Sequence, residues 1–190
     1  MNKIILTVFL AAGNLVLNAQ NAVDSIPEPE FMNQVFAWGK EHKLISLEKK
    51  DAEIVTKNKT GIGGMKQMYE MDGAKSSVVL EADNLLFVVS TSGGGLGMDP
   101  SSQFSLMKFE PKKDKRQALS ADYGGGIMKK NKPREGDNEI GLNLKKIREG
   151  VIGLVPEKPL EKGEYAFINK MSMQGGGMSM KMEAFAFSIQ

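Results

Sequence analysis

Apolar residues in this chain occur in short runs of strand length, and this feature restricts the possible folds most. Gly, Pro, Asn and Lys interrupt the runs, so no window longer than about 10 residues keeps the i, i+3, i+4 apolar spacing of a helix without a glycine. Residues 85–89 (LLFVV) are apolar throughout, which is typical of a central strand covered on both faces. The pattern predicts an all-β fold.

Ten segments have the length and composition of strands, and turn residues separate them. Within residues 76–81, Val78 and Leu80 fall on one face and Ser77, Val79 and Glu81 on the other, as in a strand with one buried face. Many short strands with such frequent turns fit two antiparallel sheets packed face to face, so we predict a two-sheet antiparallel β-sandwich. The predicted strands are residues 34–38, 43–47, 52–57, 76–81, 85–90, 104–109, 140–144, 151–155, 165–173 and 178–189.

The N-terminal sequence predicts export. A positive start precedes the largely apolar run of residues 4–16 (IILTVFLAAGNLV), and Ala19 offers a small residue for cleavage, as in a secretory signal peptide. The run is shorter than the roughly 20 apolar residues that cross a bilayer, so we predict no transmembrane segment. We expect a signal peptide over residues 1–19, an exposed lead-in over 20–32 and one β-sandwich domain over 33–190, located in the periplasm or outside the cell.

The composition excludes several classes of active site. The chain has no Cys and 1 His, which excludes thiol nucleophiles, iron–sulfur clusters, zinc ribbons and metal sites built from several histidines. His42 stands among polar residues and is predicted to be exposed, so we expect no catalytic residue. The triple-glycine tracts are predicted to be loops or hairpin tips, because none precedes a helix that would complete a phosphate-binding loop. These tracts are residues 93–95, 124–126 and 175–177.

A local excess of positive charge occurs in residues 108–148, which hold 12 Lys or Arg against 6 Asp or Glu. One interpretation is a basic face for a polyanion such as a surface glycan. We favour solvated hairpin turns whose lysines keep strand edges from pairing with other chains. The whole chain carries a net charge of only +2, and Tyr123 is the one aromatic residue of the stretch apart from Phe109. We therefore expect no nucleic-acid partner.

Methionines near the C-terminus are the residues that most suggest a ligand. Five of them surround the last glycine tract, and they are Met171, Met173, Met178, Met180 and Met182. Thioethers are soft ligands that suit Cu(I), and by the same softness Ag(I), so copper binding is one interpretation. The other is that methionine fills a core as an adaptable apolar side chain. We favour the second and expect no cofactor, with copper as the alternative.

The pairing of residues 165–189 as a hairpin separates these two interpretations. If the three glycines are the whole loop, Phe167 faces Phe185 and the two methionine groups lie on opposite faces. If the loop is one residue longer, Met173 meets Met178 and four sulfurs gather near the tip. We favour the first pairing because cross-strand aromatic pairs contribute more than methionine contacts.

Three stretches carry a resemblance to known proteins, together with Asp99-Pro100-Ser101. They are residues 43–49 (KLISLEK), 69–80 (YEMDGAKSSVVL) and 160–167 (LEKGEYAF). In this order they resemble a group of secreted bacterial β-sandwich proteins of unassigned activity, whose late motif is commonly Leu-x-Pro-Gly-Glu-Tyr-Ala. Lys162 stands at the proline position of that motif. The resemblance covers about residues 33–170 and implies a β-sandwich and secretion, but no catalytic residue.

The function that these patterns predict is that of an exported, non-catalytic binding or structural module. Its candidate partners are a protein or a surface glycan. Soft-metal binding through the methionine hairpin is the first alternative, and a hydrolase with an unrecognised site is the second.

Overall fold

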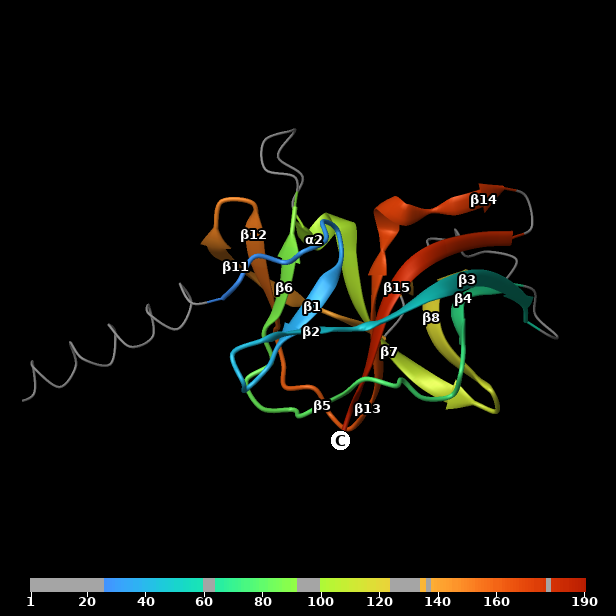
Figure 1. Ribbon diagram of the computed structural model, residues 1–190. Coiled ribbons are helices and arrows are strands. Elements are labelled where there is room, and N and C mark those ends of the chain that lie inside the picture. The colour runs from blue at the N-terminus through green and yellow to red at the C-terminus, as the bar shows by residue number, and fades with distance from the viewer. Residues whose placement is uncertain (1–25, 60–63, 92–99, 124–133, 136–137, 177–178) are drawn as a thin grey trace, which may run out of the picture.

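The computed structural model describes residues 26–59, 64–91, 100–123, 134–135, 138–176 and 179–190. This part of the chain is all-β, as predicted. Helical structure in it is limited to two short turns, α2 (Pro100–Gln103) and the 3₁₀ turn η1 (Lys170–Ser172). The strands form two sheets, and one of these closes on itself (Figure 1).

The smaller sheet has five antiparallel strands. They are β1 (Val35–Trp38), β2 (Leu44–Ser46), β6 (Phe87–Ser90), β11 (Leu142–Arg148) and β12 (Val151–Pro156). Their order across the sheet is β11-β12-β6-β1-β2, so β6 is central. All four residues of β6 are buried, as expected for the apolar run that the sequence placed in a central strand.

The larger sheet closes into a barrel of six strands. These are β3 (Glu48–Asn58), β4 (Met65–Asp72), β7 (Phe104–Lys112), β8 (Lys115–Tyr123), β13 (Gly163–Asn169) and β15 (Ser179–Ile189). They run in the order β7-β13-β15-β3-β4-β8, and β8 pairs again with β7, which closes the ring. Four short strands attach to it: β5 (Val79–Leu80), β9 (Arg134–Glu135), β10 (Glu139–Ile140) and β14 (Gln174–Gly176).

A plain two-sheet sandwich is therefore not confirmed. The smaller sheet does pack face to face against one wall of the barrel, and the core between them is built from side chains of both. Phe87 of the sheet contacts Phe167 and Phe187 of the barrel wall, with ring centroids 4.8 and 4.9 Å apart. The rest of the larger sheet curls away from this wall instead of staying flat.

Side-chain size explains why the larger sheet can close. Along β15, Phe185 and Phe187 face the smaller sheet, whereas Ala184 and Ala186 point into the barrel. Small side chains let the walls of a narrow barrel approach one another. Alanine recurs around the buried interior, which consists of Ala52, Met71, Met107, Phe109, Ala118, Ala166, Ile168, Met182, Ala184 and Ala186.

Two segments cross from the smaller sheet to the barrel without a loop. Leu47 joins β2 to β3, and Gly141 joins β10 to β11. Leu47 is buried in the core between the sheets. At the second crossing, the backbone of Gly141 accepts a hydrogen bond from the amide of Glu157, and the Glu157 carboxylate lies against its Cα. A side chain at position 141 would displace that carboxylate.

The predicted lead-in, residues 20–32, is described from Ile26 onward and is not uniformly exposed. Ile26 is 1% exposed and packs with Val88 and Val151 on the outer face of the smaller sheet. Phe31 and Met32 are exposed, as expected. The segment therefore covers part of a sheet face that would otherwise be open to solvent.

The favoured hairpin pairing is found along most of β13 and β15. Phe167 pairs with Phe185, and Tyr165 pairs with Phe187. The predicted strand 165–173 ends early, however, because η1 interrupts it after Asn169. Beyond η1 the chain resumes as β14 with a shifted register, so neither predicted pairing continues to the tip.

A buried ion cluster ties together one end of the barrel. Arg116 of β8 is fully buried, and its Nη2 donates to Glu48 Oε2 at 3.0 Å while its Nη1 donates to Glu164 Oε2 at 3.3 Å. Glu164 also accepts hydrogen bonds from the Ser76 amide at 2.8 Å and the Ser188 hydroxyl at 2.7 Å. The cluster thus joins β3, β8, β13, β15 and the loop between β4 and β5.

This cluster predicts an acid-sensitive contribution to stability from Glu48. Burial raises the pKa of Glu48, but hydrogen bonds from Arg116 and Ser76 and the charges of Arg116 and Lys50 outweigh burial and hold the pKa below its ordinary value. The ionised carboxylate therefore stabilises the fold above the pKa of an unfolded glutamate, about 4.3, and this stabilisation is lost as the pH falls through the lower folded pKa. We expect the stability difference between the parent protein and Glu48→Gln, measured by urea denaturation, to shrink below about pH 4.3. A difference that is constant down to about pH 3 would contradict this.

Candidate functional site

Three adjoining cavities run along the seam between the smaller sheet and the barrel. Their volumes are about 450, 210 and 190 Å³. The first and second share residues 157–160, and the second and third share Asn84 and Leu85. We call this row the seam groove. It is lined by residues 37–40, Ile45, residues 79–85, Lys108, residues 139–141, residues 155–161 and Tyr165.

The seam groove follows from how the chain connects its elements. One wall is the loop from β12 to β13, and another is the segment from β5 to β6. Both run along the lower edge of the molecule in Figure 1. Pro159 lies in the first of these segments and has no amide to donate to a strand ladder, so the chain leaves the sheet after Pro156 and bridges to the barrel. The groove is the space that remains between the two segments.

The first cavity contains a polar group of three side chains. Lys108 Nζ donates to Glu161 Oε2 at 2.8 Å, and the Tyr165 hydroxyl donates to the Glu161 backbone oxygen at 2.7 Å. The hydrogen bond with Glu161 raises the pKa of Lys108, and the same bond lowers the pKa of Glu161. Burial raises the pKa of Tyr165, so its hydroxyl keeps its proton and remains a donor. These groups hold the loop against the barrel.

The other end of the seam groove is apolar. Ala37, Leu80 and Leu85 of the core between the sheets line it, while Ile45 and Val79 beside them are 38% and 49% exposed. Among the described residues, two strand edges with no further partner flank this end. β2 is the last strand of its sheet, and β5 pairs only with β15. An extended chain lying here would meet free backbone donors and acceptors.

Negative charge predominates along the rim. Of the residues that line the three cavities, five are carboxylates and three are lysines. Two of the lysines are engaged, since Lys40 pairs with Glu81 and Lys108 pairs with Glu161. The hydrogen bond with Glu81 raises the pKa of Lys40. Glu139 lies 3.9 Å from Lys170, so the remaining rim carboxylates are Asp83 and Glu157, against the third lysine, Lys158. This small excess of negative charge suits a ligand with positive charge better than a polyanion.

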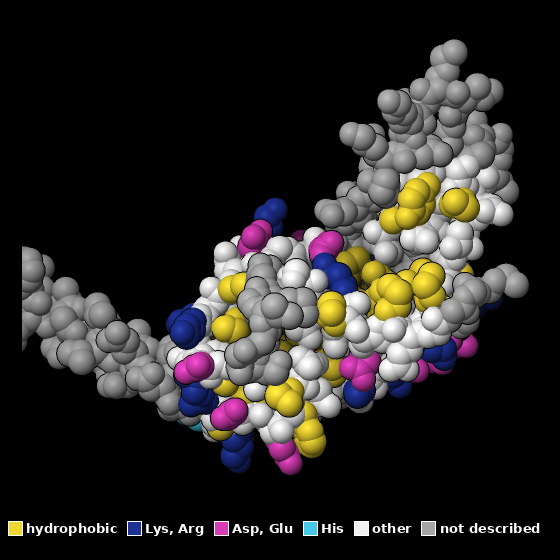
Figure 2. Space-filling view, turned by 90° about the horizontal axis from the view of Figure 1, so that it is seen from above, with side chains coloured by type: hydrophobic (Ala, Val, Ile, Leu, Met, Phe, Trp, Pro, Cys, Tyr) yellow, Lys and Arg dark blue, Asp and Glu magenta, His cyan; other side chains and the backbone are white. Residues whose placement is uncertain are grey.

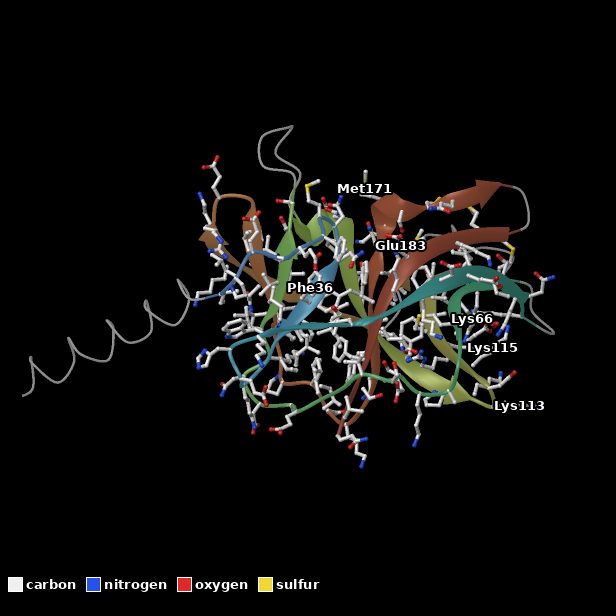
Figure 3. The ribbon with its side chains drawn as sticks, viewed as in Figure 1. Phe36, Lys66, Lys113, Lys115, Met171 and Glu183 are labelled. Carbon is white, nitrogen blue, oxygen red and sulfur yellow. The ribbon has the colours of Figure 1, made fainter. Side chains whose placement is uncertain are left out.

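The methionines predicted as a metal site lie in different environments. Met171 is 59% exposed in η1, and Met173 is 52% exposed just after it (Figure 3). Met180 is half-buried, and Met182 is buried inside the barrel. Met178 lies outside the described residues. The pairing that would gather four sulfurs at the tip is not formed, because Gly175 and not Met171 lies opposite Met180.

His42 lies where the sequence predicted it. It occupies the turn between β1 and β2 with a φ of 56°, and its side chain is exposed. Its ring meets the edge of Trp38 at 5.7 Å between centroids. Among the described residues, no group of three or more His, Cys, Asp or Glu side chains is arranged to hold a metal ion.

The described part of the basic stretch 108–148 does not form one face. Lys113 and Lys115 project from the β7–β8 hairpin (Figure 3), whereas Lys145 and Lys146 lie on the edge strand β11. Arg116 is turned inward, where it holds the ion cluster. Residues 93–95 and 124–126 fall outside the described residues. Gly175 and Gly176 belong to strand β14, where Gly176 pairs with Ser179 near the tip of the β14–β15 hairpin.

The seam groove was not predicted from the sequence. Part of the late motif at residues 160–167 lines it, since Leu160, Glu161 and Tyr165 contribute to the first cavity. That motif was assigned a purely structural role. The remaining walls come from segments far apart in the chain, and no local pattern marks residues that meet only after folding.

Comparison of the chain with protein-family models, with curated proteins and with solved structures finds no match. The resemblance to secreted β-sandwich proteins therefore stays a prediction. In the described part of the chain, no helix has the length and hydropathy to cross a membrane.

Proposed function

We propose that this chain is an exported, non-catalytic binding protein whose seam groove takes up an extended, positively charged peptide segment. The observation that carries the proposal is the row of three adjoining cavities with an apolar end and excess carboxylates at the rim. Export is supported by the leader-like sequence of residues 1–19. The wall residues of the groove provide surfaces for binding, and none of them is paired as a nucleophile with a base.

The shape of the groove supports an extended ligand. A single compact molecule would fill only the largest cavity, whereas a peptide strand crosses all three. Apolar side chains on one face of such a strand would cover Ile45, Val79 and Leu85, and its backbone could add to the free edge of β2 or β5. Alternation of side chains along a strand would place basic groups on the opposite face, near Asp83 and Glu157.

The test is binding of labelled peptides to the full-length mature protein. A fluorescein-labelled peptide of alternating valine and lysine is compared with one of alternating valine and glutamate, by fluorescence anisotropy at low salt. We expect the lysine peptide to bind more tightly and its affinity to fall as salt rises, because rim charges are screened. Asp83→Asn and Glu157→Gln are each expected to weaken binding by about 1.5- to 5-fold, the effect of losing one exposed ion pair.

Glu149→Gln is the matched control, because Glu149 is an exposed carboxylate in the turn at the opposite end of β12. It should leave the affinity unchanged. Equal affinity for the glutamate peptide, or binding that neither groove substitution alters, would contradict the proposal. Binding of a sulfated polysaccharide in preference to the lysine peptide would favour a glycan partner and also contradict it.

A further inference from the structure

The register of the β14–β15 hairpin brings three methionines to one face. β14 folds over the end of β15 at the upper end of the barrel (Figure 1). Gln174 pairs with Lys181 and Gly175 pairs with Met180. Just before β14, the Ser172 hydroxyl accepts a hydrogen bond at 2.7 Å from the Glu183 amide, which holds residues 172 and 183 side by side. Met173, which lies between these contacts, is therefore opposite Met182.

Residues opposite each other on antiparallel strands project to the same face. Met173 thus shares a face with Met182, and Met180 shares it as well, since it lies two residues from Met182 on the same strand. This is the inner face of the hairpin, because Met182 belongs to the barrel interior with Ala52. Exposure decreases from Met173 at 52% through half-buried Met180 to Met182 at 5%.

In the described part of the β14–β15 hairpin, no charged side chain shares the inner face with these sulfurs. The charged residues of this strand lie on its outer face, where Lys181 pairs with Glu53 at 3.0 Å and Glu183 pairs with Lys49 at 2.7 Å. On the inner face, Met180 lies opposite Ile54 of β3. Hydrophobic side chains reach the surface of the molecule at this upper end (Figure 2). Such a setting favours a soft monovalent cation over hard, oxygen-seeking divalent cations.

We infer that Met173, Met180 and Met182 form a thioether site for Cu(I) or Ag(I) at the upper end of the barrel. Of the four methionines that the structure describes in this part of the chain, these three share a face, and Met171 lies outside it, on the η1 turn. Thioethers carry no proton at any ordinary pH, so binding displaces none. The affinity of the site is therefore independent of pH, unlike that of a site built from histidine or carboxylate ligands.

The test is an anaerobic titration of the full-length mature protein with Cu(I), in competition with a chromogenic Cu(I) chelator. We expect one equivalent to bind with the same affinity at about pH 6 and pH 8. Met173→Leu and Met180→Leu should each lower the affinity for Cu(I) by about tenfold or more. Loss of a residue that only orients a metal ligand already lowers metal affinity by about this factor. Leucine keeps an apolar side chain of similar volume, so only the sulfur is removed.

Met171→Leu is the matched control, because Met171 is as exposed as Met173 but lies outside the shared face. It should bind Cu(I) like the parent protein. In a parallel measurement with Ag(I), the methyl NMR signals of Met173, Met180 and Met182 should shift and that of Met171 should not. Absence of binding, affinity unchanged in both Met173→Leu and Met180→Leu, or an equal loss in Met171→Leu would each overturn the inference.

Discussion

Replacement of Arg116 by alanine is expected to lower the free energy of unfolding by about 3–5 kcal/mol, the usual cost of removing one partner of a buried ion pair. Arg116 is fully buried, and it is the one cation within salt-bridge distance of Glu164 among the described residues. Its loss leaves two largely buried carboxylates, those of Glu48 and Glu164, without their shared counter-charge, and only Glu48 keeps a second cation, Lys50 at 3.5 Å. Urea denaturation of the purified variant measures the effect.

Two control variants test whether the loss of stability in Arg116→Ala comes from the ion cluster or from any substitution in or beside β8. Lys113→Ala removes an exposed cation from the adjoining turn, and it should change stability by less than about 0.5 kcal/mol. The triple variant Arg116→Met, Glu48→Gln and Glu164→Gln removes all the charges but keeps a side-chain oxygen for the Ser76 amide and the Ser188 hydroxyl. It should be more stable than Arg116→Ala, because replacing a whole buried ion cluster costs less than breaking it. A loss below about 1 kcal/mol in Arg116→Ala would show that the cluster does not hold the barrel end.

Phe167→Ala and Phe185→Ala are each expected to cost about 3–5 kcal/mol of stability, the range for deleting a buried phenylalanine ring. Both rings are at most 1% exposed, and both lie in the core between the smaller sheet and the barrel wall. Phe167 packs edge-on against Phe87, and Phe185 lies 6.4 Å from Phe104 between ring centroids. Neither neighbour can fill the cavity left behind, because strand pairing fixes its backbone.

Thermal or urea unfolding of the two variants provides the measurement. Phe31→Ala is the control, since Phe31 is 51% exposed and its truncation should cost less than about 0.5 kcal/mol. If either core variant lost less than about 1 kcal/mol, the sheet and the barrel would not share a tightly packed core. The barrel would then be expected to unfold independently of the smaller sheet.

A plain two-sheet sandwich was not confirmed, because two strands of the barrel were not recognised in the sequence. β4 (MKQMYEMD) and β8 (KRQALSADY) contain no valine or isoleucine, and lysine, glutamine and glutamate alternate along them. Each has one face in solvent and one face in a narrow interior, where methionine and alanine are the inward residues. This composition lacks the β-branched signal of a strand. Without β4 and β8 the remaining strands form two stacked layers, whereas with them the larger sheet closes.

The candidate sites, like the fold, could be predicted from the sequence only in part. The seam groove is built from segments near residues 40, 80, 110, 140 and 160, and no spacing in the sequence indicates that they meet. The methionine pattern was visible, but its geometry was not. The η1 turn changes the register between the β13 and β14 pairings with β15, and the sequence did not predict that turn. This change decides which sulfurs share a face.

From the amino-acid sequence alone it followed that the described part of the chain is all-β, that a central strand lies within residues 85–90, where the structure has Phe87–Ser90, and that Phe167 lies opposite Phe185. These properties depend on the alternation of side chains along single strands and on one hairpin, so they are local. The closure of the barrel, the inward turn of Arg116, the seam groove and the grouping of Met173, Met180 and Met182 were decided only by the tertiary structure. Each depends on contacts between residues far apart in the chain, and such contacts form only when the whole sheet has curled around its small interior side chains.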